Sequence, residues 1–371
     1  MRKLLGLLAL SLALALCGCA SDTEEPTVTD PTHIYEEVRE DFLIDAEVVS
    51  FPGDGSVTIY EATPRKLTEE QISNFLSANG DAVTEWTNTY DPNRYFGYTA
   101  DTALRGFVGH AVSKSRVYPG SFNYYNHSFV RWRDAQIYAS QQHYDDSAQY
   151  AFAHLFMEPK DFTFDTAGEA EKKVRELLSL LGFDNLILHR TLYIDHEILA
   201  DEVTPALRTD EWQSSTLEGI PTYDDWSADD DGYIFEYFTG VNSIPLFYRD
   251  VMGDITTYHG SAVQVWYQSS GIVFLYAISS LWDLGSPVET MSQLILASEA
   301  LDIAQIKLEN TKVYTDTIID KISGEYIYVP SGDKLLLKPV WVVYANSTST
   351  FTGITTRKCV VIDAVTGDEL M

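Results

Sequence analysis

Residues 166–193 read TAGEAEKKVRELLSLLGFDNLILHRTLY, and this stretch predicts a helix followed by a strand. Thr166 and Glu169 form a capping box, in which each side chain satisfies a free N–H group of the first helical turn. Gly182 follows the last apolar position and is typical of a helix end. Leu186–Tyr193 then has the composition of a strand. The apolar residues expected on one helix face are Ala167, Ala170, Val174, Leu177, Leu178 and Leu181.

Upstream of this stretch, a strand pair and a short helix are expected. Residues 43–49 and 56–60 are apolar stretches that flank the turn signal Pro52-Gly53-Asp54-Gly55. The capping box of Thr68–Gln71 then opens an amphipathic helix, which we expect to end at Gly80.

The region between these two helices predicts antiparallel strands. Residues 82–157 are rich in Tyr, Phe, Trp, Thr and Val. Local alternation of apolar and polar residues occurs at 128–133 and at 150–156, and such alternation is typical of a sheet with one solvated face.

Downstream, the same kinds of element return. We expect a helix that opens at Ser298 and strands at 233–238, 261–267, 271–278, 325–329, 334–344 and 358–364. Each half of the chain therefore contains a helix with one apolar face next to successive antiparallel strands. This pattern predicts an α+β fold, in which antiparallel sheets are each packed by one or two helices.

An acidic segment separates the two halves. Residues 201–232 lose apolar periodicity and end in DDWSADDDG at 224–232. We interpret them as a solvated linker between an N-terminal α+β domain at 41–200 and a C-terminal α+β domain at 233–371.

The first residues have the three parts of a secretion signal: a basic start, an apolar run at 4–16, and an exit of small residues. The apolar run is shorter than the roughly 20 residues that a membrane-spanning helix needs. Leu16-Cys17-Gly18-Cys19 resembles the lipobox of bacterial lipoproteins, although Cys17 stands where Ala or Ser is usual. The resemblance implies cleavage after residue 18 and lipidation of Cys19. The alternatives are a cut before Cys17 and an ordinary secretion signal.

Composition bounds the remaining chain. The formal net charge is −30, and removal of the signal takes away Arg2 and Lys3 and makes it −32. So acidic a chain argues against nucleic acid or an anionic surface as a partner. Residues 19–40 are polar and acidic, and we interpret them as a flexible tether. Cys359 is the other cysteine left after cleavage, and we expect it to be an ordinary strand residue.

Two C-terminal segments carry a family resemblance. Residues 335–343 contain Pro339-Val340-Trp341, and residues 360–368 contain Ile362-Asp363-Ala364-Val365-Thr366-Gly367. They resemble the closing hairpin of PepSY-type domains and of the YycH/YycI-like regulators. The wider layout is similar to a family of uncharacterised lipoproteins of Gram-positive gut bacteria. The resemblance implies two PepSY-like modules and an extracytoplasmic binding or regulatory role.

Several motifs suggest chemistry but lack an essential part. His196-Glu197-Ile198-Leu199-Ala200 begins like a zinc-protease helix, yet Ala200 occupies the second ligand position. Ser331-Gly332-Asp333-Lys334 matches a penicillin-recognition motif without its companion motifs, and we interpret it as a turn. Residues 224–232 imitate a calcium loop, but Phe238 stands where the loop needs a Glu. The other histidines considered are His110, His127, His143, His154, His189 and His259, and they are scattered.

The sequence therefore predicts a non-enzymatic, lipid-anchored protein on the extracytoplasmic face of the cell membrane, which binds a protein partner. It predicts no catalytic residues, metal or cofactor. The alternative is a glycan- or peptidoglycan-binding lipoprotein, with weak hydrolysis as a further option. In that hypothesis an aromatic face would be lined by Tyr90, Tyr95, Tyr98, Tyr124 and Tyr125.

Overall fold

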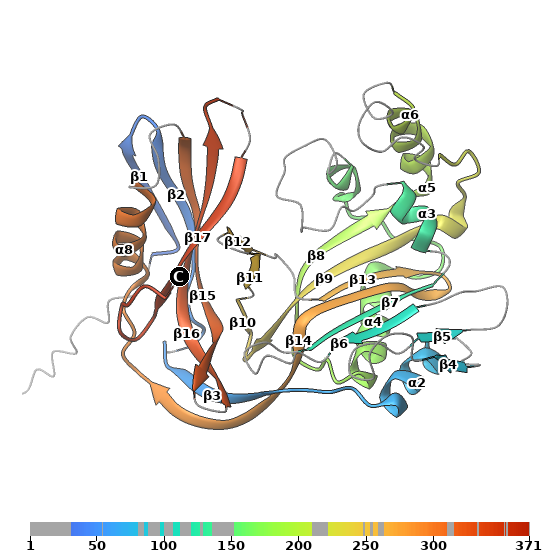
Figure 1. Ribbon diagram of the computed structural model, residues 1–371. Coiled ribbons are helices and arrows are strands. Elements are labelled where there is room, and N and C mark those ends of the chain that lie inside the picture. The colour runs from blue at the N-terminus through green and yellow to red at the C-terminus, as the bar shows by residue number, and fades with distance from the viewer. Residues whose placement is uncertain are drawn as a thin grey trace, which may run out of the picture.

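The computed structural model describes residues 31–53, 55–80, 85–87, 97–99, 107–111, 120–126, 129–135, 152–209, 222–247, 249–252, 255–258, 263–309, 315–331, 334–351, 353 and 355–370. The protein is an α+β structure with two lobes (Figure 1). Strand β14 (Gly271–Met291) runs from one lobe into the other and pairs with strands of both. No described helix has the length and hydropathy needed to cross a membrane.

The first lobe is a sheet with one helix on it. Its elements are β1 (His33–Arg39), β2 (Phe42–Val49), β3 (Val57–Pro64), α8 (Ala297–Glu309), β15 (Thr315–Ser331), β16 (Lys334–Ser349) and β17 (Thr355–Asp363). The strand order is β1-β2-β15-β16-β3-β14, and β17 also pairs with β16. The β2–β15 pair is parallel, and the other pairs of this lobe are antiparallel. Ala300 and Leu301 of α8 share a core with Ile44, Trp341 and Ile362 of the sheet.

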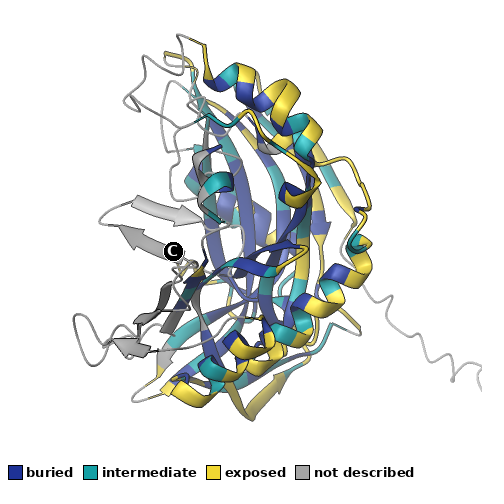
Figure 2. Ribbon diagram, turned by 90° about the vertical axis from the view of Figure 1, so that its right-hand side faces the viewer, coloured by how far each residue is buried: buried dark blue, intermediate teal, exposed yellow. Residues whose placement is uncertain are grey.

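The second lobe is a sheet covered on both faces. Its strand order is β6 (Phe107–Ala111), β7 (Gly120–Tyr125), β14, β13 (Val263–Gln268), β9 (Gly232–Val241) and β8 (Leu186–Ile194). Helices α2 (Glu69–Ala78) and α4 (Ala167–Leu180) share one core with it. The second core contains residues of α3 (Phe129–Asp134), η2 (Ala153–Phe156), η3 (Leu199–Val203) and α6 (Thr204–Leu207). In Figure 2 the strands between these layers are largely buried, while the helices are exposed on their outer sides.

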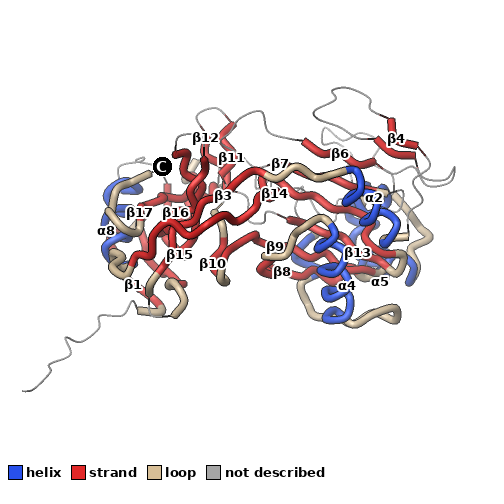
Figure 3. Tube along the Cα trace, turned by 90° about the horizontal axis from the view of Figure 1, so that it is seen from below, coloured by secondary structure: helices blue, strands red, loops and turns tan. Residues whose placement is uncertain are grey.

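Short elements complete the described structure. They are β4 (Glu85–Thr87), β5 (Gly97–Thr99), α5 (His196–Ile198), η4 (Ala228–Asp230), β10 (Ile244–Pro245), β11 (Arg249–Met252) and β12 (Ile255–Tyr258). Seen from below, α8 lies at one end of the molecule and α2, α4 and α5 lie at the other (Figure 3).

The helix signals in the sequence are confirmed. Thr166 with Glu169, and Thr68 with Gln71, form capping boxes at the starts of α4 and α2. Gly80 and Gly182 follow the two helices with φ of 88° and 77°, a backbone conformation that glycine adopts without a steric penalty. Leu186–Ile194 is a strand, and α8 opens at Ala297, one residue before the predicted start, and buries Ala300, Leu301, Ala304 and Leu308.

The predicted strand pair at the start of the chain is wrong in its pairing. Strands β2 and β3 exist, but β15 and β16 lie between them in the sheet. β2 pairs with β15, and β3 pairs with β16 at Leu335–Leu337. The turn signal at 52–55 therefore connects two strands that are not neighbours, because the C-terminal hairpin takes the place between them.

Two predicted strands are short helices. Residues 129–134 form α3, and residues 153–156 form a turn of 3-10 helix. Phe129 and Trp132 lie three positions apart and both contact Trp266 of the sheet, with ring centroids 5.1 and 5.6 Å away. The alternation at 128–133 therefore concealed a helical spacing of aromatic residues, and packing on the sheet selects the helix.

The predicted domain boundary does not match the sheet pairing. Strands from the predicted N-terminal domain pair with strands from the predicted C-terminal domain in both lobes, as β7 does with β14 and β2 with β15. Each lobe is therefore discontinuous in sequence. The predicted tether at 19–40 is also too long, because 33–39 form β1, whose Ile34 and Val38 pack on the core.

Candidate functional site

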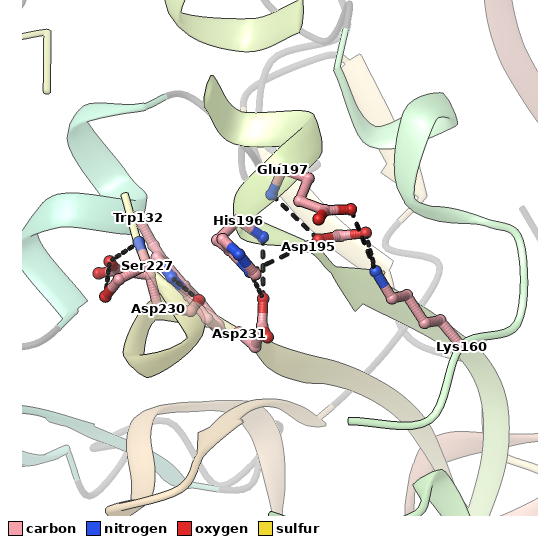
Figure 4. Close-up of polar contacts among 8 residues, drawn as sticks. All are labelled: Trp132, Lys160, Asp195, His196, Glu197, Ser227, Asp230 and Asp231. Atoms are coloured by element: carbon pink, nitrogen blue, oxygen red, sulfur yellow. Dashed lines mark hydrogen bonds and ion pairs between the residues drawn. The ribbon is translucent and has the colours of Figure 1, made fainter. Parts of the chain in front are cut away.

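Two acids and a histidine converge at one end of the second-lobe sheet. One donor atom from each of Asp195, His196 and Asp231 lies within 4.8 Å of the other two (Figure 4). Asp195 and Asp231 are buried, and His196 is partly exposed. We call these three residues the strand-end cluster.

Strand pairing creates this cluster. β8 and β9 are antiparallel neighbours, and Ile194 at the end of β8 lies opposite Gly232 at the start of β9. The residue after β8 and the residue before β9 therefore meet at the same sheet end. Gly232 is required there, because a Cβ at this position would lie 2.3 Å from the Trp132 ring and 2.4 Å from the carbonyl oxygen of Tyr267.

Hydrogen bonds hold the cluster in place. The Oδ1 atom of Asp231 accepts a bond from the backbone N–H of His196 at 2.8 Å and lies 2.7 Å from its Nδ1. The Oδ1 atom of Asp195 accepts from the backbone N–H of Glu197 at 3.0 Å and caps α5. The two carboxylates thus connect the end of β8, the start of α5 and the start of β9.

A lysine compensates part of the negative charge. The Nζ atom of Lys160 donates to the Oδ2 atom of Asp195 and lies 4.0 Å from Glu197. The hydrogen bond to Asp195 raises the pKa of Lys160, so this side chain stays charged. Burying two carboxylates without a neighbouring positive charge costs free energy. Lys160 supplies a positive charge beside Asp195, and His196 supplies a polar group beside Asp231.

The acidic residues before Gly232 are anchored to the protein. Asp230 is buried, its carboxylate accepts from the backbone N–H of Ser227 at 3.0 Å, and its backbone oxygen accepts from the Trp132 indole at 2.9 Å. Burial raises the pKa of Asp230, while Arg131, 3.4 Å away, opposes that shift. The interpretation of the whole segment 201–232 as a solvated linker is therefore wrong for Asp230 and Asp231.

The chemistry of the cluster allows two arrangements, one that binds a metal ion and one that is held by the protein's own hydrogen bonds. Two carboxylates and an imidazole form a donor set that divalent transition metals accept. In the described arrangement, however, Lys160 and backbone N–H groups already bind carboxylate oxygens of the cluster. In this arrangement the hydrogen bonds of the cluster join the end of β8 to the start of β9.

Sequence reasoning missed this cluster because His196 and Asp231 belong to two different motifs, and each motif is incomplete. His196 belongs to the incomplete zinc-protease motif, and Asp231 belongs to the incomplete calcium loop. They are 35 positions apart, and only the β8–β9 pairing joins them. Acids placed directly after one strand and directly before the next are the signal that could have indicated their meeting.

The proposed aromatic face is not formed as predicted. Tyr124 and Tyr125 are successive residues of β7 and therefore point to opposite faces. Tyr124 is fully buried and accepts a hydrogen bond from Asn79 at 3.0 Å, whereas Tyr125 is exposed. Tyr98 lies on β5, and Tyr90 and Tyr95 lie outside the described residues.

The other sequence candidates do not join the cluster. Ser331 and Lys334 lie opposite each other where β15 turns into β16, as a turn requires, and Cys359 is a β17 residue. His110 lies on β6, His154 is exposed, and burial lowers the pKa of His189 on β8. His127, His143 and His259, together with the signal and Cys19, lie outside the described residues.

The first-lobe sheet has a second face, opposite α8, that is open over β1, β2 and the start of β15. Pairing places Tyr35 opposite Asp45, and Ile318 opposite Leu43, so these four residues share this face. Tyr35 is 59% exposed and Ile318 is 41% exposed. We call this surface the open face, and it consists of Tyr35, Glu37, Leu43, Asp45, Glu47, Val49 and Ile318.

Comparisons with known proteins give the fold alone. No family model and no curated protein matches the chain. A solved structure, described as an uncharacterized protein from Eubacterium rectale, is similar to it with a TM-score of 0.59 and 19% sequence identity. The match covers 92% of this chain and 94% of that chain, so both lobes contribute to the likeness.

Proposed function

We propose that this protein is a membrane-anchored extracytoplasmic lipoprotein that binds a protein partner at the cell surface and catalyses no reaction. The observation that carries the proposal is the open face, on which exposed Tyr35, Val49 and Ile318 lie beside acidic side chains. Along β2 this face carries Leu43, Asp45, Glu47 and Val49, so apolar and acidic side chains are interspersed on it. Exposed Tyr side chains are enriched at protein interfaces.

The position of the open face supports binding near a membrane. β1 begins at His33, which is 14 positions after Cys19. If lipid on Cys19 holds the chain, the connecting residues can extend to about 45 Å at most. The lobe that carries the open face would then be the lobe next to the bilayer.

The chemistry of the open face defines the partner. Glu37, Asp45 and Glu47 lie among the apolar residues of this face, and the Nε2 atom of His33 lies 2.9 Å from the Oδ1 atom of Asp45. A complementary protein surface therefore carries Lys or Arg among its apolar residues. Such charge complementarity raises the association rate and selects against acidic competitors.

The order of elements in the first lobe supports the PepSY-like assignment, which is also part of this proposal. α8 is followed by β15, β16 and β17, which pair in that order as antiparallel neighbours. In the second lobe α4 is likewise followed by the antiparallel pair β8 and β9. We propose that each lobe carries one PepSY-like module.

Two measurements test this function. Labelled fatty acid should enter the wild-type protein and should not enter Cys19→Ala, whereas Cys17→Ala should still be labelled. Affinity capture from solubilised membranes should then recover a protein with wild type and lose it with Ile318→Glu. The matched control is Leu188→Glu, because Leu188 is 42% exposed on the second lobe. Equal capture by both variants contradicts a role for the open face.

A further inference from the structure

Strand β1 forms one edge of the first-lobe sheet. It is the end strand of the sheet order and lies at the outer side of this lobe (Figure 1). Among the described residues, β1 pairs with β2 alone. The main-chain N–H and C=O groups on its outer side are therefore not bonded within the described sheet. An edge of this kind can accept a further strand.

Hydrogen bonds show which main-chain groups of β1 point to β2. In an antiparallel pair, residues that direct both groups to the partner strand alternate with residues that direct both away. The N–H of Val48 donates to the carbonyl oxygen of Thr32 at 3.0 Å, so the even-numbered residues of the two strands face each other. On the other side of β2, the carbonyl oxygen of Asp41 accepts from the N–H of Thr317 at 2.9 Å. Odd-numbered groups thus point away from β1, in agreement with this register.

Three residues of β1 therefore present their main-chain groups at the outer edge. Ile34 and Glu36 direct these groups to β2, whereas His33, Tyr35 and Glu37 direct theirs outward. The side chains of the same three residues lie on the side of the sheet that carries the open face. The register shifts directly after Glu37, which ends the regular edge there. The unpaired edge and the open face are thus continuous.

The composition of β1 admits some added strands and excludes others. His33–Arg39 contains no Lys and no Pro, which commonly protect a free edge. Its exposed Glu36 and Glu37 make the edge acidic. A second copy of β1, or the acidic segment 20–30 of the same chain, would bring further carboxylates beside them. Like charges on neighbouring strands are destabilising, so charge selects against both.

The side chains beside the edge define the strand that fits. On the open face, the neighbouring acids are Glu37 and, on β2, Asp45 and Glu47. On the opposite face, Ile34 and Val38 pack against the core but are only partly buried. Successive side chains of a strand point to opposite faces. An added strand with alternating basic and apolar residues would pair its charges on the open face and cover Ile34 and Val38 on the other.

We infer that β1 is a docking edge for an extended basic segment of the partner protein, in which Lys or Arg alternates with apolar residues. The segment adds one strand to the first-lobe sheet. Main-chain hydrogen bonds provide affinity in this mode of recognition, and the alternating side chains provide specificity. The inference rests on the proposed function, because the added strand extends the open face.

The direct test uses the peptide Lys-Val-Lys-Val-Lys-Val-Lys, which is as long as the seven residues of β1. Proton exchange of the Tyr35 and Ile34 amides is measured by NMR in protein labelled with ¹⁵N-Tyr and ¹⁵N-Ile, and the signals are assigned by their loss in Tyr35→Phe and Ile34→Val. With nine-tenths of the protein bound, exchange at Tyr35 should slow about tenfold, because it then proceeds only from the free protein. The Ile34 amide, which points to β2, should change little. Absence of binding, or binding without slower exchange at Tyr35, overturns the inference.

Two comparisons of affinity separate strand pairing from attraction between charges. Tyr35→Pro removes the outward N–H and leaves the bonds to β2, whereas Tyr35→Val loses the ring but keeps the N–H. The peptide should bind Tyr35→Pro about three- to tenfold more weakly than Tyr35→Val, which corresponds to one lost hydrogen bond. The same peptide with N-methylated backbone amides keeps its charge and should not bind the wild-type protein. This second comparison does not depend on the folding of Tyr35→Pro. Equal binding of the two peptides overturns the inference.

Affinity capture from solubilised membranes distinguishes this inference from the proposed function. Loss of the partner in Tyr35→Pro and Ile318→Glu, with retention in Tyr35→Val, supports both. Loss in Ile318→Glu with retention in Tyr35→Pro leaves the proposed function standing and overturns the docking edge. Retention in both Tyr35→Pro and Ile318→Glu contradicts the proposed function and the inference together.

Discussion

The two lobes differ in how the two faces of their sheets are covered. In the second lobe, helices cover both faces, so the sheet lies between two cores. In the first lobe, α8 covers one face, and a smaller core around Phe247, Val342 and Tyr344 covers only the middle of the other. The strands β1 and β2 extend beyond that smaller core. Among the described residues, the second-lobe sheet is thus covered on both faces, whereas the first-lobe sheet has an exposed area at the open face.

The largest expected effect concerns a buried acid of the first lobe. Burial raises the pKa of Glu325 to about 7, against 4.5 ordinarily, and Tyr344 donates to its Oε1 at 2.7 Å. The folded state therefore holds a proton that the unfolded state releases between about pH 4.5 and 7. The free energy of unfolding should fall by about 3 kcal/mol as pH rises through that window.

Chemical denaturation at a series of pH values checks this prediction. Glu325→Gln should abolish that part of the pH dependence, and Glu289→Gln, at an exposed position of β14, should retain it. An unchanged pH profile in Glu325→Gln would show that Glu325 titrates normally.

The next effect concerns the strand-end cluster of the second lobe. Asp231→Ala leaves the backbone N–H and the ring of His196 without their acceptor, and it should lower the free energy of unfolding by about 1–3 kcal/mol. Asp229→Ala is the matched control, because Asp229 is exposed. Urea denaturation of both variants measures the difference. Equal stability would mean that the cluster does not hold the ends of β8 and β9 together.

A smaller effect concerns the cap of α4, which helps to close the second lobe. Thr166 accepts a hydrogen bond from the backbone N–H of Glu169 at 3.3 Å. Thr166→Ala should lower the free energy of unfolding by about 1 kcal/mol, whereas Thr166→Ser should retain most of the stability. Thermal unfolding followed by circular dichroism compares them. A full loss in Thr166→Ser would assign the effect to the methyl group instead.

No effect is expected from calcium. The loop at 224–232 lacks the Glu that a calcium loop needs, and its buried Asp230 and Asp231 are bound to Ser227 and His196. Calorimetry should show no heat, and the melting temperature should not change. Saturable binding that is lost in Asp231→Ala would contradict this expectation and would show that the strand-end cluster is a cation site.

Local signals in the sequence were sufficient for the three longer helices α2, α4 and α8. The capping boxes at Thr68 and Thr166, and the apolar face of α8, depend on neighbouring residues and are found in the structure. Pairing between distant strands could not be found in this way. β15 and β16 enter between β2 and β3 from about 275 positions away, and no local pattern encodes that insertion.

The candidate sites depend on the same distant contacts. His196 and Asp231 meet only because β8 and β9 pair, and Ile318 joins the open face only because β15 pairs with β2. The predicted strand was wrong at Phe129 and Trp132, because the spacing of these aromatic residues fitted both a strand and a helix. There the contact with Trp266 selected the helix.

The central claim is that the open face of the first lobe binds a protein partner at the membrane surface. Site-specific photo-cross-linking in intact cells tests it most directly, with a benzophenone side chain at position 35 and, in a second variant, at position 188. Both positions hold exposed apolar side chains, one on each lobe. We predict a discrete cross-linked protein from position 35 and none from position 188. Cross-links from position 188 alone, or from neither position, would contradict the claim.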